Sequence, residues 1–161
     1  MKVSAPAGRI STYARYEDYH IFVKKRLRKL TAFISSRVKN KAHFKICVDS
    51  APLAERALAV RAGLGFVGKN HMLINPEFGP QLFLGEIITD IELEPDKPLP
   101  NGCRDCEECL KACPAQVFRP DGLFDSNKFI SYLTIEHKGS IPSEPAWKIA
   151  DRLFGCEDCI L

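Results

Sequence analysis

The strongest structural signal in this chain is the segment Cys103-Arg104-Asp105-Cys106-Glu107-Glu108-Cys109-Leu110-Lys111-Ala112-Cys113-Pro114. Its four cysteines follow the spacing C-x2-C-x2-C-x3-C, and a proline comes directly after the last one. This spacing is typical of bacterial two-cluster iron–sulfur sites, in which the first three thiolates hold one [4Fe-4S] cluster and the fourth binds a second cluster. The segment therefore predicts an iron–sulfur site.

The close spacing of these cysteines has a physical reason. A cluster needs thiolates that converge on its corners, so a tight loop supplies three of them and a short helix supplies the next. Pro114 ends that helix, because proline lacks an amide hydrogen. A zinc site is a less favoured alternative, since structural zinc sites usually pair two C-x2-C elements across a longer spacer. A disulfide framework is less favoured still, because cysteines two residues apart are poorly placed to bridge one another.

A second cysteine pair lies downstream, in the segment Gly155-Cys156-Glu157-Asp158-Cys159. In a two-cluster protein this pair begins a second C-x2-C-x3-C-P run, whose next cysteine is expected about four residues after Cys159. The sequence stops before that position, at Leu161. We therefore expect the chain to be a truncated, partial copy of a longer protein, cut inside a metal site.

Length and composition are those of an ordinary globular protein. The 161 residues have room for one domain with a small second subdomain, and 45% of them are hydrophobic and 27% charged. The formal net charge of +3 is only a weak indication of an anionic partner. The sequence has no apolar run as long as a membrane span and no signal-peptide pattern at Met1–Gly8. Six of the seven cysteines have ligand spacing, so we expect a cytoplasmic location.

An amphipathic helix is predicted from Asp18 to about Ser36. Its apolar residues recur at helical spacing, at Val23, Leu27, Leu30 and Ile34. Basic residues occupy its other faces, at Lys24, Lys25, Arg26, Arg28 and Lys29. This basic cluster either keeps the helix soluble or contacts the phosphates of a nucleic acid, and the sequence leaves both interpretations open.

Asp49 lies between a predicted strand and a predicted helix. The strand is Phe44–Val48, and the helix is Pro52–Ala62, with Ser50 as its cap and Gly63 as its stop. In open sheets, the end of a strand where a helix begins is a common place for catalytic groups. Asp49 is therefore a candidate catalytic acid, although a capping role fits the sequence equally well.

A glycine-rich segment follows at Gly63–His71. It does not match the phosphate-binding pattern G-x4-G-K-[ST], so either another ligand approaches its backbone or two turns surround a buried Phe66. Strands are predicted at 72–74 and 81–90, joined to each other by a turn. Gly85 inside the second strand indicates a bulge or a ligand close to the backbone.

The segment 91–102 contains three prolines and is predicted to be a linker. Beyond the first cysteine run we expect a turn at 120–122, a helix at 126–137 capped by Asp125, and another helix at 145–154. The predicted fold is α+β. A small sheet with flanking helices forms a cofactor cleft within residues 1–90, and residues 103–161 form a helical, ferredoxin-like subdomain.

Taken together and in order, six segments resemble the epoxyqueuosine reductases. They are Asp49-Ser50-Ala51-Pro52, Ala62–Asn70, Phe83–Ile87, the first cysteine run, Ile130–Glu136 and Phe154–Cys159. The resemblance implies a cobalamin-dependent enzyme with two [4Fe-4S] clusters. Such an enzyme reduces epoxyqueuosine to queuosine in the anticodon loop of tRNA, with electrons from an external donor. We also expect a monomer that does not contact a membrane.

The same resemblance assigns roles to individual residues. Asp49 matches the proton donor for the departing epoxide oxygen. Cys103, Cys106 and Cys109 match ligands of the first cluster, and Cys113, Cys156 and Cys159 match ligands of the second. Positions near the corrin ring of cobalamin correspond to Arg15, Tyr16, Gly68, Lys69, Asn70 and Ser131. His20 belongs to a segment that approaches the same cavity.

One position departs from the family pattern. Phe129 stands where the family has a cysteine, the fourth ligand of the second cluster. The fourth ligand of the first cluster is expected beyond Leu161, so each cluster keeps three protein thiolates here. Two alternatives to a reductase therefore stay open, a ferredoxin-like electron carrier and an inactive gene fragment.

Overall fold

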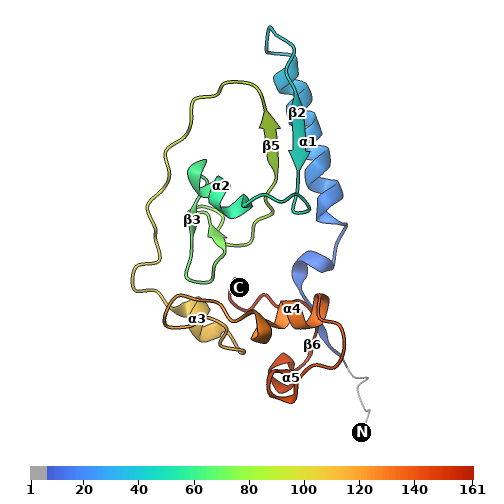
Figure 1. Ribbon diagram of the computed structural model, residues 1–161, viewed down its shortest axis with the longest axis vertical. Coiled ribbons are helices and arrows are strands. Elements are labelled where there is room, and N and C mark those ends of the chain that lie inside the picture. The colour runs from blue at the N-terminus through green and yellow to red at the C-terminus, as the bar shows by residue number, and fades with distance from the viewer. Residues whose placement is uncertain (1–6) are drawn as a thin grey trace. The chain divides into compact units, whose positions relative to one another are not determined.

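The computed structural model describes residues 7–161, which form two compact units (Figure 1). We call residues 17–104 the central unit. The terminal unit combines residues 7–16 with residues 105–161. Both units mix helices with short strands, which confirms the α+β character that the sequence predicts. None of the helices in this described range has the length and apolarity needed to cross a bilayer.

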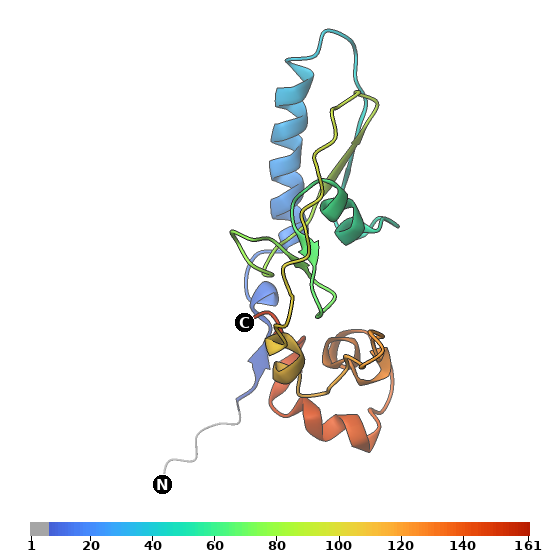
Figure 2. The ribbon, with the colours of Figure 1, turned by 90° about the vertical axis from the view of Figure 1, so that its left-hand side faces the viewer.

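The central unit is built on two antiparallel strand pairs. Its elements are α1 (Tyr19–Ser35), β2 (Phe44–Cys47), α2 (Glu55–Arg61), β3 (Phe66–Val67), β4 (Leu73–Ile74) and β5 (Glu86–Thr89). Strand β2 pairs with β5, so that Phe44 lies opposite Thr89 and Cys47 lies opposite Glu86. Helix α1 lies along this pair (Figure 2). Strands β3 and β4 form a hairpin of their own.

Helix α1 begins where the sequence predicts. The carboxylate of Asp18 accepts a hydrogen bond of 2.9 Å from the N–H of His20, which is the contact that an N-cap residue makes. Val23 and Leu27 pack against Gly85, where a Cβ atom would lie 2.9 Å from each of them. The β2–β5 register runs without a shift, and Gly85 precedes β5. Gly85 therefore allows the helix to approach closely, and the prediction of a bulge there is wrong.

The helix after Asp49 is shorter than predicted. Helix α2 begins at Glu55 rather than at Pro52, because the chain first makes a tight turn in which the N–H of Leu53 bonds to the carbonyl of Ala51. Ser50 does not cap the helix, since its hydroxyl donates to the carbonyl of Val48 at 3.2 Å. The predicted stop is confirmed: the residue after Ala62 is Gly63, whose φ is +68°.

The predicted strands at 72–74 and 81–90 do not pair with each other. Strand β4 instead pairs with β3, which directly precedes it, and β5 crosses the unit to pair with β2. The N–H of Gly68 bonds to the carbonyl of Met72 at 2.9 Å and closes the β3–β4 hairpin. The turn predicted between the two segments is confirmed, because Asn75 and Gly79 exchange two backbone hydrogen bonds across it.

The segment 91–102 contains neither helix nor strand, as its prolines predict. Its end is fixed to the β3–β4 hairpin, because the side-chain amide of Asn101 donates to the carbonyl of Val67 at 3.1 Å. The side-chain oxygen of Asn101 accepts a hydrogen bond of 2.8 Å from the N–H of Cys103. The first cysteine of the run is therefore held at the end of the central unit.

The terminal unit joins segments from both parts of the sequence. Its elements are β1 (Arg9–Ile10), η1 (Thr12–Ala14), α3 (Glu108–Ala112), η2 (Ser126–Lys128), α4 (Ile130–Ile135), α5 (Ser143–Ile149) and β6 (Arg152–Phe154). Strand β1 pairs with β6 in a parallel arrangement. The buried core consists of Ala115, Val117 and Ile130.

Two helices predicted in this unit are interrupted. The 126–137 segment starts at its predicted cap, Asp125, whose carboxylate accepts from the N–H of Asn127, but Phe129 is extended and divides it into η2 and α4. The 145–154 segment leaves the helical conformation at Ala150, where φ is +51°, and continues as β6 because β1 provides a pairing partner. The predicted turn at 120–122 is confirmed by the pairing of Phe118 with Phe124 across it.

Candidate active site and cysteine cluster

Asp49 occupies a strained turn at the end of β2. Its φ of +56° lies in the left-handed region, and the N–H of Ser50 bonds back to the carbonyl of Val48 at 2.6 Å. This pattern is a γ-turn with Asp49 at its centre, a conformation that costs about 1–3 kcal/mol. Val48 is completely buried, so the strand holds one end of the turn firmly while Asp49 faces outward.

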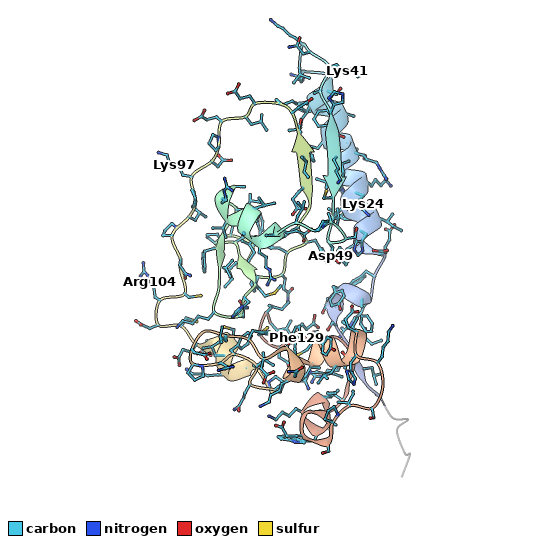
Figure 3. The ribbon with its side chains drawn as sticks, viewed as in Figure 1. Lys24, Lys41, Asp49, Lys97, Arg104 and Phe129 are labelled. Carbon is cyan, nitrogen blue, oxygen red and sulfur yellow. The ribbon has the colours of Figure 1, made fainter. Side chains whose placement is uncertain are left out.

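Two side chains of α1 contact the carboxylate of Asp49. The hydroxyl of Tyr19 donates to Oδ2 at 2.9 Å, and Nε2 of His20 lies 3.4 Å from the same oxygen. The other ring nitrogen of His20, Nδ1, lies 2.8 Å from Oδ1 of Asp18. Hydrogen bonding to His20 holds the pKa of Asp18 below its ordinary value. Asp49 lies at the β2 end that faces the start of α1 (Figure 3).

An aromatic stack supports this contact. The Tyr19 ring stacks on the His20 ring, with centroids 4.1 Å apart, and on the Phe83 ring, with centroids 4.5 Å apart. The second pair is nearly parallel, at an interplanar angle of 12°. Because stacked rings favour fixed separations, the stack restricts where the Tyr19 hydroxyl and the His20 imidazole can lie.

Asp49 also lines an open cleft of about 470 Å³. This volume lies within the range of small-molecule sites, about 300–1,000 Å³. The other lining residues are Leu53, Ala54, Glu55, Arg56, Ala57, Val67 and His71. The guanidinium of Arg56 donates to the carbonyl of His71 and so ties α2 to the β3–β4 loop. A carboxylic acid in a cleft of this kind can give a proton to a bound molecule.

Two glutamates lie behind the Asp49 turn. Oε1 of Glu55 accepts a hydrogen bond of 2.6 Å from the N–H of Asp49. Burial and the nearby Glu55 carboxyl raise the pKa of Glu86 to about 7. Oε2 of Glu86 is buried and has no hydrogen-bond partner among the described residues.

Three of the predicted metal ligands meet in the terminal unit. Cys113, Cys156 and Cys159 line one small pocket, whose walls include the apolar side chains of Val117 and Ile130. Burial and neighbouring thiols raise the pKa of Cys159 to about 11, and burial raises the pKa of Cys156. Within residues 7–161, no three Cys, His, Asp or Glu side chains surround a single metal-ion position. The donor set that converges here is sulfur in an apolar setting, which suits an iron–sulfur cluster.

The remaining cysteines of the run divide between the units. Cys103 belongs to the central unit, whereas Cys106 and Cys109 belong to the terminal unit, before and within α3. Phe129 lines the pocket of the three thiols and meets the ring of Phe124 edge-on, with centroids 5.0 Å apart. None of the cysteines in the described chain forms a disulfide.

Two models of known protein families match different parts of this chain. The family model "4Fe-4S double cluster binding domain" matches residues 102–161, and the model "Epoxyqueuosine reductase QueG, DUF1730" matches residues 2–50. An epoxyqueuosine reductase from Francisella cf. novicida is 43% identical to this chain, and the match covers 100% of this chain. This chain is similar to the epoxyqueuosine reductases along all of its sequence. It spans 45% of the length of that Francisella relative.

Solved epoxyqueuosine reductases share the fold. The structure of the enzyme from Streptococcus thermophilus matches 99% of this chain and 43% of its own, with a TM-score of 0.89 and 36% identity. A crystal structure of an epoxyqueuosine reductase with an epoxyqueuosine-modified tRNA stem loop matches 89% of this chain and 37% of its own. Its TM-score is 0.81 and its identity is 40%.

Three of the residues that the resemblance places near the corrin, Gly68, Lys69 and Asn70, lie in the β3–β4 loop and pack within it. Gly68 is buried beside Ile74, which a side chain at Gly68 would overlap, and Asn70 is 5% exposed and accepts from the N–H of Met72 at 3.1 Å. Lys69 is half-buried between them. These contacts shape the hairpin loop, and the cofactor role of the loop stays a prediction.

The other three predicted cofactor residues belong to the terminal unit. Arg15 donates to the carbonyl of Ile10 at 2.6 Å, and Tyr16 is 78% exposed. The hydroxyl of Ser131 accepts a hydrogen bond of 3.0 Å from the N–H of Cys156. Ser131 therefore supports a predicted cluster ligand. Sequence reasoning had not assigned this contact to it.

Sequence reasoning missed Tyr19, Glu55 and Glu86. Tyr19 stands next to His20, so the helix phase could have placed both at the start of α1. Glu86 offered a signal too, because it is an ionisable residue in the apolar stretch 82–88. Glu55 offered none, since the helix start that brings it under Asp49 was predicted elsewhere.

Proposed function

We propose that this chain carries the reductive centre of an epoxyqueuosine reductase, which converts epoxyqueuosine in tRNA to queuosine, with Asp49 as the proton donor. The observation that carries the proposal is the position of the Asp49 carboxyl. It lines a cleft of small-molecule size and is held by Tyr19 and His20. Similarity to the epoxyqueuosine reductases supplies the reaction class.

The reaction needs both electrons and protons. Removing an epoxide oxygen breaks two C–O bonds, forms a C=C bond and releases water, which takes up two electrons and two protons. Asp49 gives one proton to the departing oxygen, because an alkoxide is a poor leaving group until it is protonated. The Tyr19 hydroxyl then stabilises the carboxylate that remains, through the same hydrogen bond of 2.9 Å.

The second proton comes from solvent by way of the open side of the cleft. His20 lies between Asp18 and Asp49, so its ring can pass a proton to the Asp49 carboxylate and restore the acid. The 62% exposure of the Asp49 side chain lets water and substrate reach it. These steps use only side chains of the central unit.

Cobalamin, when bound, supplies a low-valent cobalt that delivers the electrons to the substrate. The residues that would hold it are those of the β3–β4 loop, Gly68, Lys69 and Asn70, with Arg15 and Tyr16 from the terminal unit. The cleft of about 470 Å³ supports this placement, because its lining includes Val67 and His71, the residues on either side of this loop. Ser131 fits the cofactor less well than the cluster, because its hydroxyl is bonded to Cys156.

Iron–sulfur clusters, when bound, would supply the reducing equivalents, which would come from an external donor in the cytoplasm. Cys103, Cys106 and Cys109 would bind one cluster, and Cys113, Cys156 and Cys159 the other. The pocket that Cys113, Cys156 and Cys159 share supports the second assignment. A simple electron carrier would need this pocket but would leave the Asp49 site without a purpose.

The substrate side of the proposal is a tRNA anticodon stem loop. A relative has been solved with an epoxyqueuosine-modified tRNA stem loop. In this chain α1 carries five basic residues and no acidic ones, and four of the five are exposed: Lys25, Arg26, Arg28 and Lys29. The guanidinium groups of Arg26 and Arg37 lie over the exposed rings of Phe22 and Phe33. Phosphate groups would be attracted to such a face.

The decisive experiment is reduction of an epoxyqueuosine-containing stem loop by the purified chain reconstituted with iron, sulfide and cobalamin. We expect queuosine by mass spectrometry, cob(II)alamin and cluster signals in paramagnetic resonance, and loss of product in Asp49→Asn. Asp90→Asn is the matched control, because Asp90 also pairs with a histidine, His43, in the central unit. Retention of cobalamin without any product, or full activity of Asp49→Asn, would contradict the proposal.

A further inference from the structure

Glu55 and Glu86 form what we call the carboxyl pair, and it lies directly behind the Asp49 turn. Glu55 is the first residue of α2, and Glu86 is the first residue of β5. The two carboxyls interact with each other, and Glu55 also accepts the hydrogen bond of 2.6 Å from the N–H of Asp49. The pair is therefore one contact away from the proposed acid.

The Asp49 turn needs a restraint of this kind. A residue with φ of +56° persists only where the surroundings hold it, because the conformation is intrinsically unfavourable. The N–H of Asp49 bonds to Glu55, and the N–H of the following residue bonds to Val48. Removing the first contact leaves one of the two backbone restraints on the turn.

Ionising both carboxyls of the pair at once is unfavourable in free energy. Ionised carboxylates only accept hydrogen bonds, so two of them repel unless a proton lies between them. Oε2 of Glu86 is buried without a partner among the described residues, and a proton shared with Glu55 would satisfy the pair. Burial and the Glu55 charge raise the pKa of Glu86 to about 7, which agrees with that arrangement.

The surroundings contain little that could neutralise the pair in another way. On β2, the residue opposite Glu86 is Cys47, whose thiol is buried. From α1, the side chains that pack next to Glu86, against Gly85, are the apolar Val23 and Leu27. Within residues 7–161, neither Glu55 nor Glu86 has an ion pair with Lys, Arg or His.

We infer that Glu55 and Glu86 share one proton and that this protonated pair positions Asp49 for catalysis. Glu86 keeps the proton, and Glu55 holds the Asp49 amide. When Glu86 ionises, repulsion moves the Glu55 carboxylate and loosens the turn, so the orientation of Asp49 depends on pH. The catalytic part of this inference rests on the proposed function, whereas the shared proton does not.

Nuclear magnetic resonance on the full chain tests the pair without any assay of activity. In wild-type protein labelled at glutamate carboxyl carbons and backbone nitrogens, we expect Glu86 to titrate with a midpoint of about 7. The Asp49 amide signal should shift with the same midpoint. In Glu86→Gln this amide shift should disappear, while the control Glu77→Gln, at an exposed turn of the same unit, should retain it.

Two results would overturn the inference. One is a Glu86 midpoint near the ordinary value of about 4.5 in the wild-type chain, which needs no variant to fold. The other is an Asp49 amide signal that still shifts with the same midpoint in Glu86→Gln, since the shift would then come from a group outside the carboxyl pair. In Glu55→Ala we expect the Asp49 amide to exchange with solvent at least about tenfold faster.

Activity then separates the two proposals. In the reconstituted reductase assay, the wild-type rate should fall as the pH rises above about 7, and Glu86→Gln should remove that fall. A chain that shows the resonance shifts but never forms queuosine would leave the carboxyl pair intact and reject the proposed function. Parallel pH profiles in wild type and Glu86→Gln would reject Glu86 as a positioning residue.

Discussion

The hydroxyl of Tyr19 donates a hydrogen bond to the carboxylate of Asp49 across 2.9 Å, from the first residue of α1 to the end of β2. The Tyr19 ring is fixed between His20 and Phe83, so this donor has little freedom to turn away. The contact therefore links the packing of α1 to the orientation of the proposed acid.

Tyr19→Phe keeps the aromatic stack and removes only the hydroxyl. Hydrogen bonds to charged groups contribute about 1.5–3 kcal/mol, so we expect the single-turnover rate of epoxide reduction to fall about tenfold or more. Rapid-quench measurement of queuosine formation tests this. Tyr132→Phe, in α4 of the terminal unit, is the matched control. Equal rates for Tyr19→Phe and wild type would mean that the hydroxyl does not act on the reacting form.

Glu86→Gln should change the pH dependence of stability. Because the pKa of Glu86 is raised in the folded protein, the folded chain keeps a proton between about pH 4.5 and 7 that the unfolded chain has lost. The free energy of unfolding therefore falls as the pH rises through this window. Allowing for solvent screening, we expect a loss on the order of 1–2 kcal/mol, absent in the glutamine variant.

Urea denaturation followed by circular dichroism at several pH values measures this difference. Glu77→Gln should follow the wild-type curve. The raised pKa of Glu86 would be contradicted if the free energy of unfolding of the wild type changed between pH 4.5 and 7 no more than that of Glu86→Gln.

The features that the sequence predicts well are those whose contacts join residues close together in the sequence. The start of α1 follows from Asp18 and its neighbours alone, so it was predictable. The partner of β4 was not, because a two-residue strand carries too little pattern to select among partners. Glu55 and Glu86 come together only through the β2–β5 pairing and the late start of α2. Asp49 was predicted from its position after a strand, but its γ-turn was not.

Gly68→Ala separates the structural role of the β3–β4 loop from its predicted cofactor role. A Cβ atom at Gly68 would overlap the Ile74 side chain and lie 2.9 Å from the Asn70 side-chain oxygen. We expect the cofactor-free chain to lose about 1–3 kcal/mol of stability, as in other overpacked sites. Lys69→Ala should leave stability unchanged, since Lys69 is half-buried in the loop but is not needed for its closure. Thermal unfolding of both variants without cobalamin gives the comparison.

Phe129→Cys should add a sulfur ligand to the pocket of Cys113, Cys156 and Cys159. Phe129 already lines this pocket, so a thiol there points to the place where a cluster would bind. We expect more iron and sulfide per chain after reconstitution, and slower cluster loss in air. Phe129→Ser removes the same edge-on contact with Phe124 but supplies no sulfur, and it should bind less iron than Phe129→Cys. Equal iron contents would place the cluster elsewhere.

Lys29→Glu tests the basic face of α1. If this face contacts the phosphates of the stem loop, the variant should bind more weakly, and its affinity should depend less steeply on salt, by about one unit of slope per lost contact. Lys97→Glu makes the same charge change in the 91–102 segment of the same unit (Figure 3). Fluorescence anisotropy with a labelled stem loop at several salt concentrations compares them. Equal losses in both variants would indicate a general charge effect.

The pairing of β1 with β6 imposes an order on biosynthesis. Arg9 and Ile10 are translated before the 17–104 segment, whereas their strand partner Arg152–Phe154 is translated after it. The 17–104 segment has all of its own strand partners by then and can fold while translation continues. Any cluster bound by the thiols of Cys113, Cys156 and Cys159 could accordingly be completed only after Cys159 is translated, so iron loading would follow synthesis of the 17–104 segment.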